Sequence, residues 1–292
     1  MWDAIKDAIM AATGEPFSIA TRRSIGGGCI NAAWVVEGGG LRYFVKTNTT
    51  ERLAMFEAER DGLRELANAA AVRVPQPVCL GCADGSAFLV LEHIFLKDAG
   101  QSGAELLGRQ LAAQHHVTAP AFGWWRDNTL GATFQPNTPS ADWIAFWRER
   151  RLGHQLNLAA RAGHHGALQR RGEKLLAALP AFFRGYMPQP ALLHGDLWSG
   201  NAACDPAGKP VIFDPATYYG DREADIAMTE LFGGYPLAFY AAYRESFPLD
   251  PGYATRKTLY NLYHILNHLN LFGGGYLAQA EKMMGTLLAE VG

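Results

Sequence analysis

The feature that most constrains the fold is the stretch 192–216, which reads LLHGDLWSGNAACDPAGKPVIFDPA. It carries three oxygen-bearing side chains at fixed intervals, Asp196, Asn201 and Asp214. One carboxylate is free to accept a hydroxyl proton, while the amide and the second carboxylate supply hard oxygen ligands. Mg²⁺ takes such ligands, normally one or two carboxylates together with substrate phosphates. We therefore expect Asp196 to be a catalytic base, and Asn201 and Asp214 to bind Mg²⁺.

The surroundings of these residues predict short strands and a hairpin. Apolar runs at 191–193 and 211–213 deliver the two aspartates at strand ends, and turn formers at 205–209 join the second half into a hairpin. The catalytic loop of protein kinases has the same internal spacing, HRDxxxxN followed by a metal-binding aspartate. Here Gly195 replaces the arginine, and Asp214 opens DPA instead of DFG. These departures favour a small-molecule kinase built on the protein-kinase fold.

The composition fits a chain with two lobes. Its 292 residues, 49% apolar and 18% charged, are enough for two cores. A net charge of −2 gives no broad basic field, so neither nucleic acid nor an anionic membrane is expected as a partner. The first residues form an amphipathic pattern unlike a signal peptide, and no run of about eighteen apolar residues occurs. The four cysteines are too scattered for a disulfide framework, so we expect a cytoplasmic protein.

A glycine-rich turn near the N-terminus is the first candidate nucleotide contact, formed by Gly26, Gly27 and Gly28. Strands are predicted on either side of it, at 17–22, 34–37 and 42–47. Glycine has no Cβ, so the backbone N–H groups of such a turn can approach phosphates closely. The sequence contains no GK[ST] and no following helix here, so the turn is neither a Walker A loop nor a Rossmann fingerprint. A plain glycine-rich hairpin is the alternative.

Lys46 follows the apolar residues of the third predicted strand, as does the kinase lysine that contacts the α- and β-phosphates. Kinases orient this lysine with a glutamate on the next helix, and both Glu57 and Glu59 lie at a suitable distance along the chain. They project about 200° apart on a helix, so only one can face the lysine. We predict Glu59, because Met55 and Leu63, one turn away on either side, place it beside the buried stripe.

An apolar strand leads into Glu92, His93 and Ile94, which we interpret as the link between the lobes. In the kinase architecture the backbone of this link meets the adenine edge. We therefore divide the chain into a nucleotide-binding lobe, residues 1–93, and a catalytic and substrate-binding lobe, residues 94–292. Helices are predicted at 51–68 in the first lobe and at 99–117, 142–160, 164–183, 224–231, 236–246, 253–270 and 275–292 in the second.

Several polar residues of the second lobe are assigned structural roles or left open. Asp225 opens a helix, where a carboxylate faces free N–H groups, and we expect it to hold the backbone of the catalytic loop. His115 is expected to be a packed or hydrogen-bonded core residue. Gln135 and Asn137 lie in a long loop, where their amides suit either sugar hydroxyls or turn caps. The segment after Asp214 is too short for a phosphorylated activation segment.

These motifs resemble those of the fructosamine kinase (ketosamine-3-kinase) family, within the aminoglycoside-phosphotransferase-like kinases. The resemblance rests on GGGCIN at 26–31, FVK at 44–46, LEH at 91–93, QPNTPSADW at 135–143, HGDLWSGN at 194–201, DPATYYGDRE at 214–223, ELFGGY at 230–235 and LYHILNHLNLFG at 262–273. It implies an α+β, bilobal protein-kinase-like fold with a small antiparallel-sheet N-lobe and a mainly helical C-lobe. It also implies that ATP and Mg²⁺ serve to phosphorylate the 3-hydroxyl of a fructosamine or ribulosamine, free or protein-bound. That 3-phosphate is unstable, so the sugar is then lost and the amine is regenerated.

Three residues are candidate substrate contacts. Trp198 lies two residues after Asp196, where its ring can pack on the sugar or serve the core. Glu223 follows the second aspartate motif, and His268 belongs to a helical segment with more His and Asn than a core needs.

Cys29 is a small residue in the glycine turn, in surroundings that favour a thiolate. The resemblance implies redox control through a disulfide between chains at this cysteine, so we expect a monomer or a redox-linked homodimer.

Two alternative functions stay open. Aminoglycoside- and choline-type phosphotransferases share the HGDxxxxN motif and the later aspartate. Aminoglycosides are polycations that favour an acidic cleft, and only Asp221 and Glu223 add carboxylates near Asp196, which disfavours this alternative. A nucleotide-binding pseudokinase is disfavoured because every expected catalytic group is present.

Overall fold

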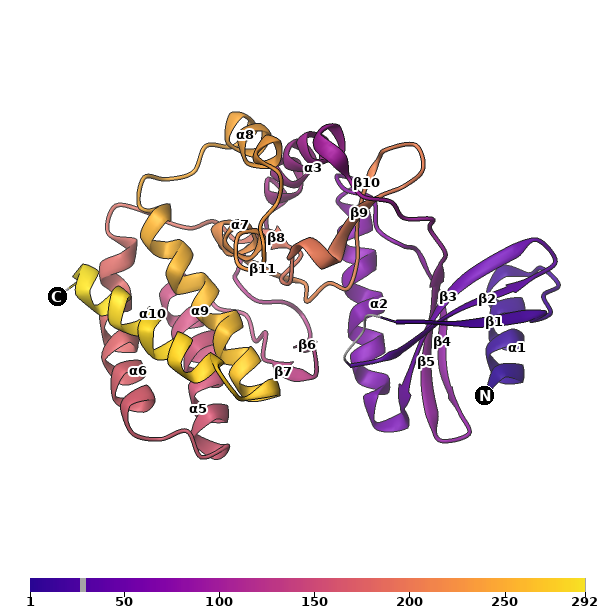
Figure 1. Cartoon of the computed structure of the whole chain (residues 1–292), viewed down its shortest axis with the longest axis horizontal. Coiled ribbons are helices and arrows are strands. Elements are labelled where there is room, and N and C mark those ends of the chain that lie inside the picture. The colour runs from indigo at the N-terminus through magenta and orange to yellow at the C-terminus, as the bar shows by residue number, and fades with distance from the viewer. Residues whose placement is uncertain (27–29, 292) are drawn as a thin grey trace.

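The computed structural model describes residues 1–26 and 30–291, which form two lobes (Figure 1). The N-terminal lobe consists of helix α1 (Trp2–Thr13), strands β1 (Thr21–Ile25), β2 (Ala32–Gly38) and β3 (Leu41–Thr49), helix α2 (Leu53–Asn68), and strands β4 (Pro77–Ala83) and β5 (Ser86–Glu92). These strands pair antiparallel in the order β1-β2-β3-β5-β4. The expected antiparallel sheet of the N-terminal lobe is therefore confirmed.

Strand β5 is apolar because both of its faces are covered. Successive side chains of a strand point to opposite faces. Ala87, Leu89 and Leu91 accordingly pack in one core cluster with α2, whereas Phe88 and Val90 pack in a second cluster with α1. Figure 1 shows these two helices on opposite sides of the sheet, with α2 on the side of the C-terminal lobe.

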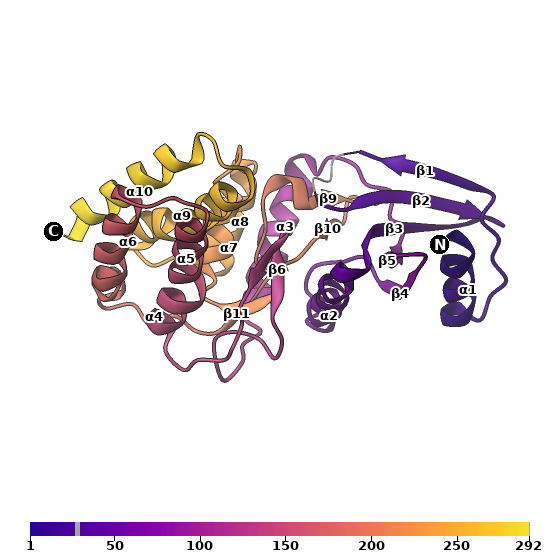
Figure 2. The same ribbon diagram turned by 90° about the horizontal axis from the view of Figure 1, so that it is seen from below.

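The C-terminal lobe is mainly helical. Its helices are α3 (Gly100–His115), α4 (Trp143–Phe146), α5 (Gly153–Arg161), α6 (Ala167–Ala178), α7 (Glu223–Thr229), α8 (Leu237–Ser246), α9 (Tyr253–Phe272) and α10 (Tyr276–Val291). Short antiparallel pairs lie between them: β6 (Asn128–Leu130) with β7 (Thr133–Gln135), β8 (Ala191–Leu193) with β11 (Tyr218–Gly220), and β9 (Ala202–Cys204) with β10 (Pro210–Ile212). Figure 2 shows most of the helices gathered at the end of the molecule far from the large sheet. The expected α+β, bilobal class is confirmed.

Two predicted helices are interrupted. The helix expected over 142–160 contains a π-helical turn at Trp147–Leu152, which separates α4 from α5. The helix expected over 164–183 begins at α6 and ends in a 3-10 turn, Leu179–Phe183. Pro180 accounts for this ending, because its nitrogen carries no hydrogen for the next α-helical bond.

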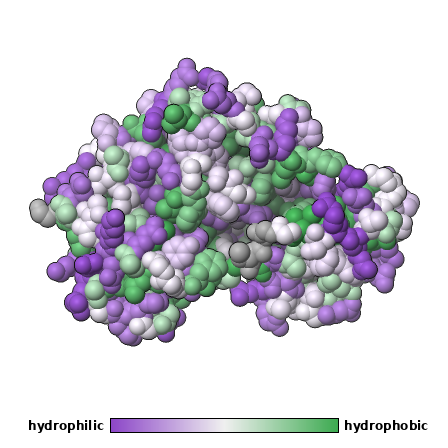
Figure 3. Space-filling model, in the orientation of Figure 1, coloured by the Kyte–Doolittle hydropathy of each residue, from purple (hydrophilic) through white to green (hydrophobic). Residues whose placement is uncertain are grey.

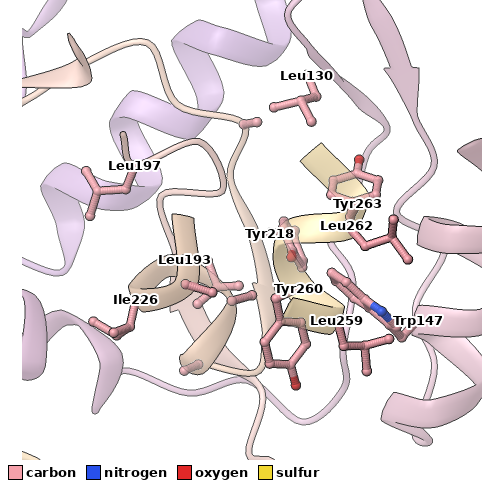
Figure 4. Packing of buried hydrophobic residues seen from close by; sticks show 14 of the residues in the cluster. Leu130, Trp147, Leu193, Leu197, Tyr218, Ile226, Leu259, Tyr260, Leu262 and Tyr263 are labelled. Atoms are coloured by element: carbon pink, nitrogen blue, oxygen red, sulfur yellow. The ribbon is translucent and has the colours of Figure 1, made fainter. Parts of the chain in front are cut away.

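The core of the C-terminal lobe packs behind the central motif. Leu193 of β8, Tyr218 of β11 and Ile226 of α7 belong to one core cluster with Tyr260 and Tyr263 of α9 (Figure 4), and all five are almost fully buried. This packing fixes β8, whose end leads into the HGD motif. Among the described residues, no helix combines the length and the apolar character needed to cross a membrane.

Candidate active site

The loop after β8 is held by one buried carboxylate. Asp225, in the first turn of α7, accepts hydrogen bonds from the backbone N–H groups of His194 (2.7 Å) and Gly195 (2.8 Å). Its Oδ2 also lies 3.3 Å from Nε2 of buried His115. Gly195 has a φ of +85°, and a Cβ there would lie 2.1 Å from the carbonyl oxygen of Ala216, so glycine is required. The structural roles predicted for Asp225 and His115 are confirmed.

Asp196 and Asn201 face each other within this loop. The amide Nδ2 of Asn201 donates to the backbone oxygen of Asp196 (2.8 Å) and to its carboxylate Oδ2 (3.3 Å). Burial raises the pKa of Asp196 to about 7, and the negative charges of Asp214 and Asp225 act in the same direction. A carboxylate whose pKa lies near neutrality is well suited to act as a general base.

Lys46 crosses from the sheet to the other lobe. Its cross-strand partner in β5 is Leu89, so its side chain leaves the sheet on the face that α2 covers. There its Nζ lies 2.5 Å from Oε1 of Glu59 and 2.6 Å from Oδ1 of Asp214. Burial alone lowers the pKa of Lys46, but these two carboxylates raise it above its ordinary value, so the ammonium stays charged.

The structure distinguishes the two glutamates of α2. Glu59 has a side chain that is only 10% exposed and contacts Lys46. Glu57 is 38% exposed and lies 3.4 Å from Arg126 instead. The contact with the lysine is therefore made by the glutamate beside the buried stripe, as the helical spacing predicts.

These groups line a cleft of about 1020 Å³ between the lobes. In Figure 3, hydrophobic and hydrophilic residues meet in the hollow that separates the two lobes. Among the predicted nucleotide contacts, the cleft is lined by Gly26, Lys46, Glu59, Glu92, His93 and Ile94, beside the apolar side chains of Val35, Phe44, Leu91, Phe213 and Met228. Such a mostly apolar slot next to a few charged groups suits a nucleotide base. Gly27, Gly28 and Cys29 lie outside the described residues.

A second part of the cleft is lined by rings of the C-terminal lobe. Trp198 is 38% exposed, and its ring lies 6.4 Å from that of Phe232, which lies 4.9 Å from the ring of His268. The rings of Phe272 and Tyr276 lie 5.5 Å and 5.2 Å from that of His268. All five residues line the cleft, and we call them the aromatic wall. Trp198 and His268, both predicted substrate contacts, belong to it.

The prediction that Glu223 contacts the substrate is wrong. Its side chain is fully buried and accepts hydrogen bonds from Nε (2.7 Å) and Nη2 (3.0 Å) of Arg256 on α9. Asp221 is also buried, and it accepts bonds from the hydroxyls of Tyr186 (2.8 Å) and Tyr260. Neither carboxylate lines the cleft. The expectation that these two residues add negative charge near the catalytic loop is wrong for the same reason.

The loop amides have structural roles. Gln135 and Asn137 are both fully buried. The Oε1 of Gln135 accepts from the hydroxyl of Tyr263 (2.7 Å), and the Oδ1 of Asn137 accepts from Nη2 of Arg151 (2.7 Å). Their polar groups therefore hold the loop against α9 and the π-helical turn, and they are not available to a sugar.

His264 belongs to the segment whose excess of His and Asn the sequence shows, but it was not among the candidate substrate contacts. His264 on α9 is 5% exposed, and its Nδ1 lies 4.0 Å from Oδ1 of Asp196. Its spacing of four residues from His268 places both imidazoles on one helix face. That spacing, in a segment with an excess of polar residues, was the signal that could have found it.

The fold and these contacts define a class of protein. A lysine from an antiparallel sheet meets a glutamate of the adjacent helix and an aspartate of the helical lobe, as in protein-kinase-like phosphotransferases. An aminoglycoside phosphotransferase in complex with ADP and hygromycin B has a TM-score of 0.66 to this structure, over 99% of this chain and 98% of the other. At 16% identity that likeness shows the fold alone.

The family is narrower than this class. Residues 1–290 match the fructosamine kinase family, and the chain belongs to that family. The resemblance drawn from the motifs is confirmed.

Individual relatives agree with this assignment. The chain is 48% identical to a protein named probable ketoamine kinase from Synechocystis, over 97% of this chain and 95% of the relative. It is 42% identical to the chloroplastic protein-ribulosamine 3-kinase of Arabidopsis thaliana, over 98% and 88% of the two chains. A crystal structure from Haemophilus somnus, named as a candidate fructosamine-3-kinase, has 30% identity and a TM-score of 0.91, over 99% of this chain and 98% of that one.

Proposed function

We propose that this protein is an ATP-dependent ketosamine 3-kinase, which transfers the γ-phosphoryl group of ATP to the 3-hydroxyl of a fructosamine or ribulosamine. The observation that carries the proposal is the contact of Lys46 with both Glu59 and Asp214, on the cleft that also holds Asp196. Membership of the fructosamine kinase family, and relatives named for ketoamines and ribulosamines, support the class of acceptor.

The nucleotide is held from both lobes. Lys46 contacts the α- and β-phosphates, and the backbone of Gly26, which lines the cleft, borders the triphosphate; contacts by Gly27 and Gly28 stay a prediction. The backbone of Glu92, His93 and Ile94 borders the adenine. Glu59 keeps the ammonium of Lys46 in place, since the two groups are in direct contact.

Asp196 accepts the proton of the sugar hydroxyl. The hydroxyl oxygen attacks the γ-phosphorus, the bond from that phosphorus to the β–γ bridging oxygen breaks, and ADP leaves with the electron pair. Such general-base assistance contributes about 10²- to 10⁴-fold, and positioning and electrostatics supply most of the remaining rate.

Asn201 and Asp214 fit a Mg²⁺ ion by the chemistry of their donors. The hydrogens of the Asn201 amide bond Asp196, which leaves its oxygen as a ligand beside the carboxylate of Asp214. Asn201 and Asp214 would hold the ion together with oxygens of the bound phosphates, since Mg²⁺ is normally bound by one or two carboxylates plus substrate phosphates. The ion, when bound, neutralises charge on the phosphates.

The charge of the cleft favours a ketosamine over an aminoglycoside. The acidic side chains among its described lining residues are Glu59, Glu92, Asp196 and Asp214. Glu59 and Asp214 pair with Lys46, and Glu92 pairs with Arg73. A polycation therefore finds little free negative charge, whereas the aromatic wall suits the C–H face of a sugar and a single ammonium.

A coupled assay of ADP release tests the proposal. Erythrulosamines, ribulosamines and fructosamines are supplied with saturating ATP and Mg²⁺, alongside kanamycin, choline and a control without acceptor. We expect turnover with at least one ketosamine and none above the control with kanamycin or choline. Turnover with kanamycin alone would show that the protein is an aminoglycoside phosphotransferase instead. No turnover with any acceptor would contradict the kinase proposal and favour a nucleotide-binding module.

The Asp196→Asn variant serves as the matched control for catalysis. We expect it to bind ATP as the wild-type protein does, while its turnover falls by about 10²-fold or more. Near-normal turnover would remove Asp196 from the mechanism. The expectation of a redox-linked homodimer stays a prediction, because Cys29 lies outside the described residues.

A further inference from the structure

His264 is a buried histidine with an unused polar atom. It lies in the middle of α9 and lines the cleft. Its side chain is 6% exposed, and its Nδ1 has no hydrogen-bond partner among the described residues. Buried side-chain nitrogens in folded proteins nearly always have a partner, so this atom calls for one from outside the chain.

The other polar residues of α9 that line the cleft do not share this property, whereas Asn261 and Asn270, whose Oδ1 atoms also have no partner among the described residues, lie outside the cleft lining. Asn267 also lines the cleft, but its Oδ1 accepts from Nε2 of Gln155 (3.2 Å) and its Nδ2 donates to the backbone oxygen of Leu130 (3.4 Å). The Nδ1 of His268 donates to the backbone oxygen of His264 (2.8 Å). Within the cleft lining, the fold therefore gives hydrogen-bond partners to Asn267 and His268 and leaves Nδ1 of His264 without one among the described residues.

The position of this imidazole points to the acceptor sugar. The 4.0 Å between Nδ1 of His264 and Oδ1 of Asp196 is longer than a hydrogen bond, which spans about 2.7 to 3.2 Å, so the two groups do not bond each other. Two adjacent hydroxyls of one sugar can reach both atoms. Burial, together with the nearby His268, lowers the pKa of His264 to about 3, so the ring is neutral and can donate to or accept from a hydroxyl.

We propose that His264 is a substrate-positioning residue, which bonds the 4-hydroxyl of the ketosamine while Asp196 holds the 3-hydroxyl that is phosphorylated. This role rests on the proposed function. The direction of the sugar follows from burial: the amine carries the bulky group and must point outwards, to where Phe272 of the aromatic wall is 52% exposed. The sugar tail, which begins at carbon 4, then points towards the buried His264.

The wild-type protein alone provides the first test. A ketosamine and its 4-deoxy analogue are compared for kcat/KM at saturating ATP and Mg²⁺. Losing one hydrogen bond to a buried group should lower kcat/KM for the analogue roughly 10- to 100-fold. Equal values for the two substrates would overturn the role of His264. No phosphorylation of the parent ketosamine would instead overturn the proposed function, and the role of His264 with it.

Two variants then separate hydrogen bonding from packing. His264→Leu should lower kcat/KM for the parent ketosamine about as much as the 4-deoxy change does, with little further loss on the analogue. His264→Asn places an amide near the position of Nδ1 and should restore most of the preference for the parent. A loss of equal size on both substrates in His264→Leu, with no rescue by His264→Asn, would show a structural role and contradict the proposal.

Discussion

The substitution Lys46→Met removes the cation that the two lobes share. In the folded protein Lys46 contacts Glu59, whose side chain is 10% exposed, and Asp214, whose side chain is 49% exposed. Methionine has a similar length and no charge. After the substitution Asp214 can turn to water, but Glu59 is left as a buried carboxylate without its cationic partner.

The size of the stability loss depends on the difference in burial between Glu59 and Asp214. Removing one partner of a buried ion pair costs about 3 to 5 kcal/mol. Because Glu59 is the carboxylate that stays buried, we expect the free energy of unfolding to fall by about 3 kcal/mol near pH 8.

The loss should also depend on pH. Burial already raises the pKa of Glu59, although Lys46 lowers it, and the variant lacks that opposing charge. A raised carboxyl pKa means that the folded variant binds a proton at a pH where the unfolded chain, with a pKa of about 4.3, does not. The stability of the variant relative to the wild-type protein therefore recovers as the pH falls from about 8 towards about 5.5.

Urea unfolding followed by tryptophan fluorescence measures this directly. The wild-type protein, Lys46→Met, and the double variant Lys46→Met/Glu59→Gln are compared at both pH values. The double variant should regain much of the loss near pH 8, because the stranded charge is gone. A Lys46→Met loss that is below about 1 kcal/mol, or that is equal at both pH values and in the double variant, would refute this reasoning.

Three further outcomes are expected. Asp214→Asn should weaken binding of ATP in the presence of Mg²⁺ far more than binding of metal-free ATP, measured by nucleotide titration; equal effects would remove Asp214 from the metal site. Trp198→Ala should raise KM for the ketosamine several-fold and leave KM for ATP unchanged, whereas an unchanged ketosamine KM would assign the ring a packing role. Asp225→Asn places an amide nitrogen against one of the two backbone N–H groups that the carboxylate binds. The free energy of unfolding should therefore fall by about 2 to 3 kcal/mol, and kcat should fall with it. A variant with wild-type stability would contradict the role of Asp225 in holding the loop.

The local parts of the site could be predicted because a few residues set their geometry. Asp196 and Asn201 are five positions apart and bond within one loop. The choice of Glu59 over Glu57 needed only the helical repeat and the position of the buried stripe. The direction of the Lys46 side chain follows from the alternation of side chains along a strand. Its partner in β5 packs on the face of the sheet that α2 covers, and the lysine points to the same face.

Long-range partners could not be predicted in the same way. The sequence shows that Glu223 is an acidic residue close to the second aspartate motif, which is equally consistent with a cleft residue and a core residue. The location of its side chain depends on Arg256, 33 positions further along the chain, which donates hydrogen bonds to it in the core. The amides of Gln135 and Asn137 were undecided for the same reason, since their partners lie on segments that only the fold brings close.

Helix α9 shows why such partners decide function. Its sequence repeats Tyr, His and Asn at helical spacing, so every one of them is an equally good candidate for a polar contact. In the structure, the hydroxyls of Tyr260 and Tyr263 donate to other elements, Asn267 bonds two neighbours, and His268 donates to its own helix. These bonds hold α9 behind the catalytic loop and remove those groups from the ligand. The nitrogen of His264 is left over on the cleft side, and an atom that the fold leaves unpaired beside a catalytic carboxylate is the one a substrate can use.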